Sequence, residues 1–177
     1  RITKSYSSRD KLIWSEDAAY TYYLHGPLAR TELGQYKVQG IDYAYTLQGW
    51  LKGINSDSLS QLYDIANDGK QGTMFERVSR DVYSFKIGYF NADYSPVGGS
   101  AASAFTKKTY TSPGSLDNSG NELFNGNISY TTLALSKINT AAVTGYSYGY
   151  DQLNRLVEMR QHKTNAAGGW SNSDIIT

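Results

Sequence analysis

Residues 146–159, YSYGYDQLNRLVEM, decide the fold expected for this chain. In an extended chain, tyrosines at alternating positions project from one face. Asp151 and Asn154 are typical turn residues, and an apolar/polar alternation resumes after them. The stretch therefore predicts a β-hairpin, with a strand, a tight turn and a returning strand.

The same spacing occurs three times in the chain. Two tyrosines lie two residues apart, glycine or asparagine follows four residues after the second, and leucine follows two residues later. The members are Tyr20, Tyr22, Gly26 and Leu28; Tyr43, Tyr45, Gly49 and Leu51; and Tyr148, Tyr150, Asn154 and Leu156. The chain's own residue frequencies give roughly 0.02 expected matches. Glycine and asparagine enter the left-handed region most cheaply, so this shared position is predicted to have a positive φ.

The composition favours β structure and excludes several functional classes. The 177 residues include 16 tyrosines against 5 phenylalanines, and aromatic residues favour strands and cross-strand contacts. A net charge of +1 with mixed signs gives no electrostatic case for binding nucleic acid or an anionic membrane. No apolar run is long enough for membrane insertion. The chain has no cysteine, which excludes disulfides and thiolate metal sites.

We expect one all-β architecture of stacked antiparallel hairpins over residues 1–177. Hairpins are predicted near residues 18–34, 40–55, 122–135 and 144–163, the third from Asn125-Gly126 between apolar flanks. An irregular crossover is predicted at 56–73 and a loop insertion at 95–121. Because Leu59 and Leu62 fall at helical spacing, a short helix is the alternative for the crossover.

Two further stretches have strand patterns. Near the start, strands are expected at 2–6 and 12–14, joined by a polar turn. In 74–94, Tyr83 and Phe85 alternate with Ser84 and Lys86, which places the large apolar residues on one face. The chain opens without methionine and stops without a polar tail, so we expect it to be a fragment of a longer array.

Residues 148–156, YGYDQLNRL, resemble the YD repeat of the bacterial Rhs family, which teneurins and toxin-complex shell proteins share. Asp151 supplies the aspartate, and Asn154, Arg155 and Leu156 match the Gly/Asn-Arg-Leu that follows it. Segments 25–30, 39–55 and 123–128 also resemble parts of Rhs-repeat proteins. The first two tyrosine copies lack the aspartate, having Tyr23 and Thr46 in its place.

The resemblance implies a specific function. In that family, hairpins lie side by side in a long spiralling sheet that closes into a hollow shell around a C-terminal toxin or effector. The implied location is secreted or cell-surface, and the implied partners are the rest of the shell, its cargo and a secretion apparatus. The family's self-cleaving aspartate motif and a toxin domain are absent from this sequence. The chain is therefore expected to be a structural wall segment that is no enzyme and has no cofactor.

The candidates for chemistry have structural interpretations. His25 lies in a Gly-Pro turn and is far in sequence from His162, the other histidine. Two histidines without cysteine make a poor zinc set. Glu16 and Asp17 are adjacent, so on a strand they point to opposite faces. An enzyme on a β scaffold remains an alternative, which a clustered pocket of polar side chains would support.

A carbohydrate-binding or adhesive module is the other alternative. Tryptophan and tyrosine rings form stacking platforms for sugars in shallow sites. Trp50 follows the turn at Gly49 and is the residue expected to contact a glycan in that case. If Trp50 is buried between hairpins, this alternative loses its best support.

Overall fold

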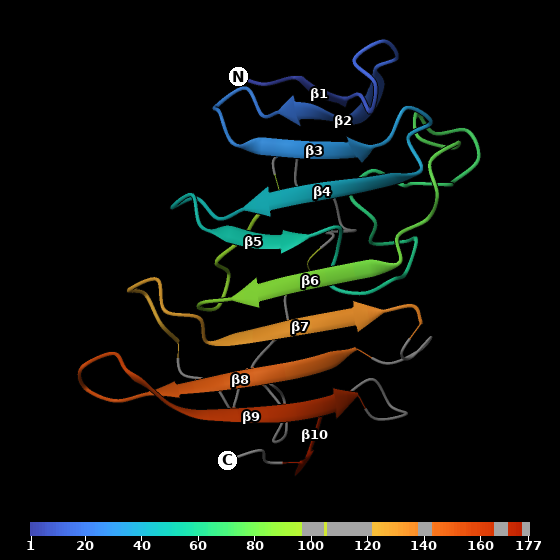
Figure 1. Ribbon diagram of the computed structural model, residues 1–177. Coiled ribbons are helices and arrows are strands. Elements are labelled where there is room, and N and C mark those ends of the chain that lie inside the picture. Colours follow the sequence, from blue (N-terminus) through green and yellow to red (C-terminus); the bar gives the residue numbers. More distant parts are fainter. Residues whose placement is uncertain (97–104, 106–121, 138–142, 165–169, 175–177) are drawn as a thin grey trace.

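The computed structural model describes residues 1–96, 105, 122–137, 143–164 and 170–174, which form ten strands and no helix (Figure 1). The strands are β1 (Lys4–Ser7), β2 (Ser15–Tyr22), β3 (Leu28–Leu33), β4 (Gln39–Tyr45), β5 (Leu51–Ile54), β6 (Tyr83–Gly88), β7 (Tyr130–Leu135), β8 (Thr144–Tyr150), β9 (Leu156–Thr164) and β10 (Trp170–Asp174). They form one sheet in chain order, and every neighbouring pair is antiparallel. The predicted all-β antiparallel class is confirmed.

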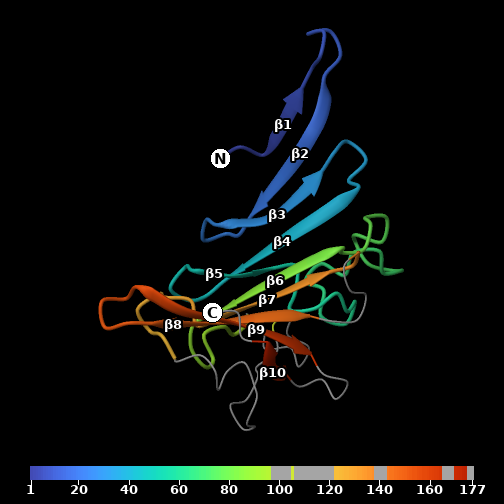
Figure 2. The same cartoon turned by 60° about the horizontal axis from the view of Figure 1, so that its bottom comes forward.

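The sheet is open and twisted. Among the described strands, β1 and β10 are the two edges. Figure 2 shows β1 and β2 running at a steep angle to β8 and β9, as the accumulated right-handed twist of many strands requires. The described residues contain no helix that is long and apolar enough to span a membrane.

Three strand pairs occupy the positions of predicted hairpins. They are β2–β3 for 18–34, β4–β5 for 40–55 and β8–β9 for 144–163. The segment 122–135 differs from its prediction because its one strand, β7, pairs with β6 and β8. Asn125-Gly126 does form a turn, with φ of 89° at Gly126. However, the Leu123 and Ser129 amides flanking it donate to the carbonyls of Tyr89 and Gly88, so the two flanks do not pair with each other.

The predicted crossover is irregular and runs through residues 55–82, longer than the expected 56–73. The alternative of a short helix is wrong. The Asp64 carboxylate accepts hydrogen bonds from the backbone amides of Ala66, Asn67 and Asp68, and this local turn competes with helical hydrogen bonding. Of the predicted loop insertion 95–121, only residues 95, 96 and 105 lie within the described residues.

The expected strand at 12–14 is also wrong, because these residues belong to the β1–β2 turn. Asp10 Oδ1 accepts hydrogen bonds from the amides of Leu12 (2.9 Å) and Ile13 (3.0 Å). Lys11, which lies between Asp10 and Leu12, has a φ of 63°, and this conformation interrupts the extended backbone. The side chains of Leu12 and Ile13 are consequently exposed at the tip of the turn.

The three tyrosine-marked hairpins reverse through the same hydrogen bonds. The residue after the second tyrosine (Tyr23, Thr46 or Asp151) donates its amide to the carbonyl four residues later, at 2.9, 2.8 and 3.0 Å. Its own carbonyl accepts the amide three residues later, at 2.9, 2.9 and 3.0 Å; these donors are Gly26, Gly49 and Asn154. Their φ angles are 125°, 85° and 60°, so the predicted positive φ is confirmed.

The register at these turns is also shared. The second tyrosine lies opposite the leucine in each pair: Tyr22 with Leu28, Tyr45 with Leu51, and Tyr150 with Leu156. In each hairpin a register shift immediately precedes this pair. Such a bulge strengthens the local twist where the chain leaves the sheet. Three sequence copies therefore produce one local geometry.

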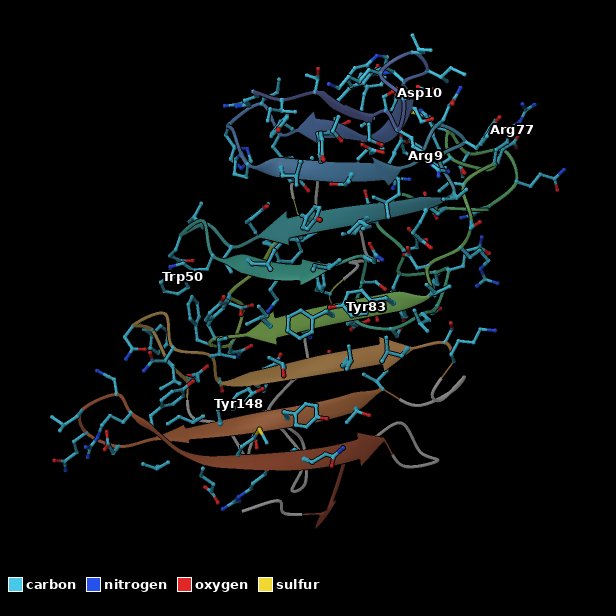
Figure 3. All side chains as sticks on the ribbon, viewed as in Figure 1. Arg9, Asp10, Trp50, Arg77, Tyr83 and Tyr148 are labelled. Carbon is cyan, nitrogen blue, oxygen red and sulfur yellow. The ribbon has the colours of Figure 1, made fainter. Side chains whose placement is uncertain are left out.

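The two faces of the sheet differ in chemistry. On β6, Ser84 and Lys86 are buried, whereas Tyr83 and Phe85 are half-buried. The predicted separation of large apolar residues onto one face is present, but the polar face is the more deeply covered. Figure 3 shows Tyr83 and Tyr148 on the opposite face, which we call the open face. Cross-strand neighbours on that face include Tyr43, Ile54, Phe85 and Leu133.

Replacement of Gly49 by alanine isolates the cost of the turn conformation. Gly49 has a φ of 85°, and an added Cβ would meet no atom within 4 Å. We expect Gly49→Ala to lower the free energy of unfolding by about 1–2 kcal/mol, because only the left-handed backbone is penalised. Gly49→Asn should cost less. Urea denaturation measures both.

Leu47→Ala is the matched control, because Leu47 lies in the same turn and its side chain is 98% exposed. It should change the free energy of unfolding by less than about 0.5 kcal/mol. Equal losses for Gly49→Ala and Leu47→Ala would contradict the role assigned to the positive φ.

Candidate functional site

The sequence-predicted positions lie along strand ends and do not converge on one site. In the first copy, the Tyr20 hydroxyl lies 3.3 Å from Ser5 Oγ, and Tyr22 donates to the Ile2 carbonyl at 2.7 Å. In the third copy, the Tyr148 hydroxyl lies 3.0 Å from Thr131 Oγ1, and Tyr150 donates to the Ile128 carbonyl at 3.0 Å. In both copies, the tyrosines therefore reach the chain segment that precedes their own hairpin.

The second copy is tied to the first by another tyrosine. Tyr23 donates its hydroxyl to the Tyr43 carbonyl at 2.7 Å, and its ring meets that of Tyr45 edge-on with centroids 6.3 Å apart. Burial raises the pKa of Tyr23, since the ionised phenol would lose its hydration. These tyrosines therefore join neighbouring hairpins.

The aspartate of the third copy stabilises its own turn. Asp151 Oδ1 accepts the amides of Leu153 and Arg155, both at 2.9 Å, and Oδ2 accepts Arg155 Nε at 2.7 Å. These hydrogen bonds hold the pKa of Asp151 below its usual value. In the second copy, Thr46 Oγ1 accepts the Trp50 amide at 3.2 Å. Asp151 therefore acts as a turn acceptor.

Trp50 is half-buried and makes packing contacts. Its ring centroid lies 5.0 Å from that of Tyr89. Gly126 lies against another part of the indole, because an added Cβ there would be 3.1 Å from Trp50 Cζ2. Trp50 in the β4–β5 turn thus packs against the connection between β6 and β7. Its packing gives the sugar-stacking alternative no additional support.

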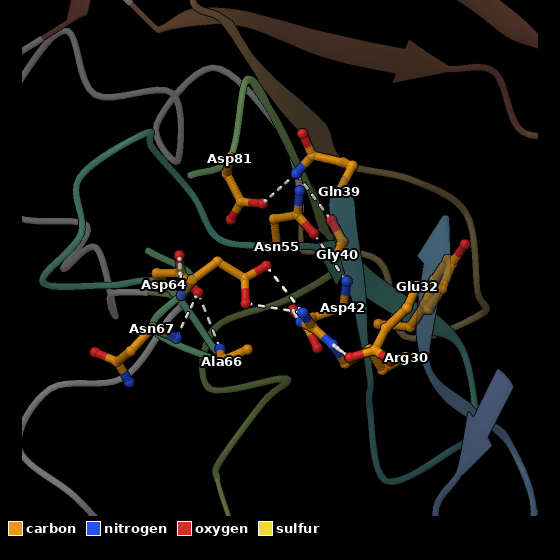
Figure 4. A network of polar contacts seen from close by, with 12 residues as sticks. Arg30, Glu32, Gln39, Gly40, Asp42, Asn55, Asp64, Ala66, Asn67 and Asp81 are labelled. Atoms are coloured by element: carbon orange, nitrogen blue, oxygen red, sulfur yellow. Dashed lines mark hydrogen bonds and ion pairs between the residues drawn. The ribbon is translucent and has the colours of Figure 1, made fainter. Parts of the chain in front are cut away.

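The most concentrated group of charged side chains surrounds Arg30 on β3 (Figure 4). Arg30 Nη1 lies 2.5 Å from Asp42 Oδ2 on β4, and Nη2 lies 2.8 Å from Asp68 Oδ1 in the crossover. Nε lies 3.4 Å from Glu32, which also binds Lys37 at 2.8 Å. We call Arg30, Glu32, Asp42, Asp64, Asp68 and Asp81 the Arg30 cluster.

The centre of the Arg30 cluster is buried on the covered face of the sheet, whereas Asp64 and Asp81 are half-buried. The relative exposure of Arg30 is 5%, of Asp42 4% and of Asp68 0%. Burial raises the pKa of Asp42 to about 6, although the attraction of Arg30 partly opposes the shift. Burial also raises the pKa of Asp68. One guanidinium therefore does not offset the desolvation of the carboxylates that it binds.

Asp81 lies at the end of the crossover, next to the start of β4. Its Oδ1 accepts a hydrogen bond from Gln39 Nε2 at 3.3 Å, and its buried Oδ2 has no hydrogen-bond partner among the described residues. Burial raises the pKa of Asp81 to about 8, with a further contribution from the negative charges of Asp64, Asp68 and Asp42. The surroundings of Asp81 therefore favour its protonated form.

Two other buried polar pairs lie on the covered face. Lys52 Nζ contacts both carboxylate oxygens of Asp93, at 2.6 and 2.7 Å, and the Tyr89 amide donates to Asp93 at 3.0 Å. Ser147 Oγ lies 2.8 Å from His162 Nε2. Both residues of this second pair are 2% exposed.

The sequence analysis did not identify the Arg30 cluster. Its signal is a charged residue at alternating strand positions, Arg30 and Glu32 on β3 and Asp42 on β4, with Gly40 beside them. Asp68 comes from the crossover, and its pairing with Arg30 depends on how that segment folds back. Among the described residues, no group of three His, Cys, Asp or Glu side chains is arranged to hold a metal ion. The cluster is therefore a candidate for mechanical coupling between the crossover and the sheet.

No protein-family model matches the chain, and no curated protein matches it either.

Removal of the central guanidinium should destabilise the protein strongly. We expect Arg30→Met to lower the free energy of unfolding by about 3–5 kcal/mol, because the buried carboxylates lose their compensating charge. Chemical denaturation at pH 7 measures the change. Arg155→Met is the control, since Arg155 also pairs with an aspartate but has a side chain that is 72% exposed. Similar losses for both variants would contradict the importance of burial.

Gly40 provides an independent test of the same cluster. An added Cβ at Gly40 would overlap the Arg30 guanidinium and the Asp68 carboxylate. We expect Gly40→Ala to cost about 1–3 kcal/mol through overpacking, with increased exchange of the crossover amides.

Gly149→Ala is the control for Gly40→Ala, because the nearest atom to its added Cβ is Cβ of the exposed Glu158, at 3.2 Å. Hydrogen exchange should show no change in the crossover for that variant. A crossover that is equally protected in Gly40→Ala and the wild type would contradict the close packing described.

Proposed function

We propose that this chain is a structural segment of an Rhs-type YD-repeat shell, which encloses a C-terminal toxin or effector for delivery to another bacterium or a host cell. The observation that supports this most is the shared geometry of the three tyrosine-marked turns. They have the same two backbone hydrogen bonds, a positive φ at the same position and the same Tyr–Leu register. A repeated local unit is what a wall built by repetition requires.

The contacts between hairpins support a wall that extends laterally. A single hairpin is marginally stable in water and has two unpaired edges. Here the hydroxyls of Tyr22, Tyr23 and Tyr150 bind backbone carbonyls of neighbouring segments. Each added hairpin therefore gains side-chain hydrogen bonds beyond the strand pairing. In the proposed shell, further hairpins continue the sheet at β1 and β10.

The different chemistry of the two faces suggests their orientation. The covered face holds the buried polar residues, among them Arg30, which binds the crossover, whereas the open face has half-buried rings such as Tyr43, Tyr83 and Tyr148. We assign the open face to the interior of the shell. Tyrosine suits such a lining because its ring contacts apolar cargo while its hydroxyl meets water or backbone. The chain contributes a wall and is assigned no catalytic step.

Limited proteolysis of the complete product of the coding sequence that contains this chain tests the proposal. We expect its C-terminal segment to resist trypsin when the shell is intact. A double replacement of turn residues, Gly49→Val with Asn154→Val, should expose that segment, because valine does not tolerate a positive φ. Mass spectrometry of the digest identifies the fragments.

The control is Leu47→Ser with Leu153→Ser, which changes the same two turns at side chains that are 98% and 72% exposed. This variant should protect the C-terminal segment as the wild type does. A complete product without an enclosed C-terminal segment, or one digested equally in all three forms, would contradict the shell function.

A further inference from the structure

We propose that the crossover, residues 55–82, is a proton-dependent latch that stays on the sheet while Asp81 is protonated and detaches when Asp81 ionises. The inference does not depend on the proposed shell function. It concerns how a long segment without regular secondary structure is held on the covered face of β3 and β4.

A few attachments to β3 and β4 hold the crossover. Asp68 binds Arg30 Nη2 through both oxygens, at 2.8 and 3.1 Å. The Arg30 guanidinium also lies 4.0 Å from the ring centroid of Phe75, which places a second part of the crossover on the same side chain. Arg30 is thus the main attachment point of the crossover. The strength of this attachment depends on the charges around the Arg30 guanidinium.

At the far end of the crossover, the attachment depends on Asp81. Gln39 at the start of β4 donates its Nε2 to Asp81 Oδ1, and the backbone of Gln39 forms a parallel bridge with Ser79. Figure 4 shows Asp81 directed toward Gln39, and Asp64 lines the same small recess as Asp81. Ionisation of Asp81 would therefore act directly where the crossover rejoins the sheet.

The charges that face Asp81 come from every element packed around it. The strands contribute Arg30 from β3 and Asp42 from β4. Arg30 also pairs with Glu32, which binds Lys37 in the β3–β4 turn. The crossover contributes Asp64, Asp68 and Arg80; Arg80, Asp64 and Asp81 line one small recess. Carboxylates outnumber the buried cations, and Asp81 Oδ2 lacks a hydrogen-bond donor among the described residues. An ionised Asp81 would consequently add a further negative charge to a group of carboxylates that shares one buried guanidinium, that of Arg30.

The direction of the pH dependence follows from the raised pKa values. In the attached state, the pKa of Asp81 is about 8, and in an open, hydrated crossover it returns toward 3.8. The attached state therefore holds the proton more tightly, so its stability is complete below pH 4 and is lost as pH rises to 8. Asp42, with a pKa of about 6, adds to this dependence only at the acidic end.

Hydrogen exchange measured at several pH values tests the latch. Protection factors, corrected for the intrinsic pH dependence of exchange, are followed in the 64–80 segment of the full chain. We expect the opening equilibrium to increase by up to about tenfold per pH unit between pH 6 and 8 and to level off above pH 8. Amides of β8 and β9 should remain equally protected and serve as the internal control.

Asp81→Asn is the decisive variant, because asparagine keeps an acceptor for Gln39 but cannot ionise. It should keep the crossover protected from pH 6 to 9. A wild-type crossover whose protection does not change with pH, or an identical pH dependence in Asp81→Asn, would overturn the proposal.

Carbon-13 NMR titration of the Asp81 carboxyl in the wild-type chain provides a test that requires no substitution. A midpoint well above the ordinary aspartate value supports the latch, and a midpoint near 4 overturns it.

Discussion

Three hairpins of the sheet depend on reversing the chain at positions that only a few residue types adopt at low cost. At Gly26, Gly49 and Asn154 the backbone has a positive φ, which lets two amide–carbonyl hydrogen bonds close each turn. The same turn then fixes a bulge and places a tyrosine opposite a leucine. Because side chains alternate along a strand, this register also decides which residues reach each face. In these three hairpins, the turn therefore helps to set which side chains lie on each face.

A half-buried antiparallel sheet usually covers its apolar face and exposes its polar face, whereas in this sheet the polar face is the more deeply covered. Lys86, Ser147 and Arg30 are buried on the covered face, while many tyrosines lie half-exposed on the open face. Buried charges require partners, and the partners of Arg30 and Lys52 come from segments outside the strands, at Asp68 and Asp93. The irregular segments thus supply the charges that the covered face needs. The pairing of Arg30 with Asp68 couples the crossover to the sheet. Because Asp81 lies among the same carboxylates, we expect the attachment of the crossover to depend on pH.

The sequence predicts local features well and long-range ones poorly. The hairpins around Gly26, Gly49 and Asn154 are predictable because both the turn residue and the strand alternation are local signals. The hairpin predicted from Asn125-Gly126 does not form, because a turn signal does not show whether the residues on either side of the turn pair with each other. The spacing of Leu59 and Leu62 suggests a helix, yet Asp64 binds the following amides instead. The Arg30–Asp68 pair joins residues 38 positions apart, and no local pattern indicates it.

Electron cryomicroscopy of the complete product that contains this chain tests the central claim most directly. The account predicts a hollow particle whose wall includes the ten strands side by side in chain order, with the tyrosine-marked turns repeated along it and the open face turned inward. A map in which these hairpins belong to a compact domain, with the open face packed against a core of its own, would contradict it.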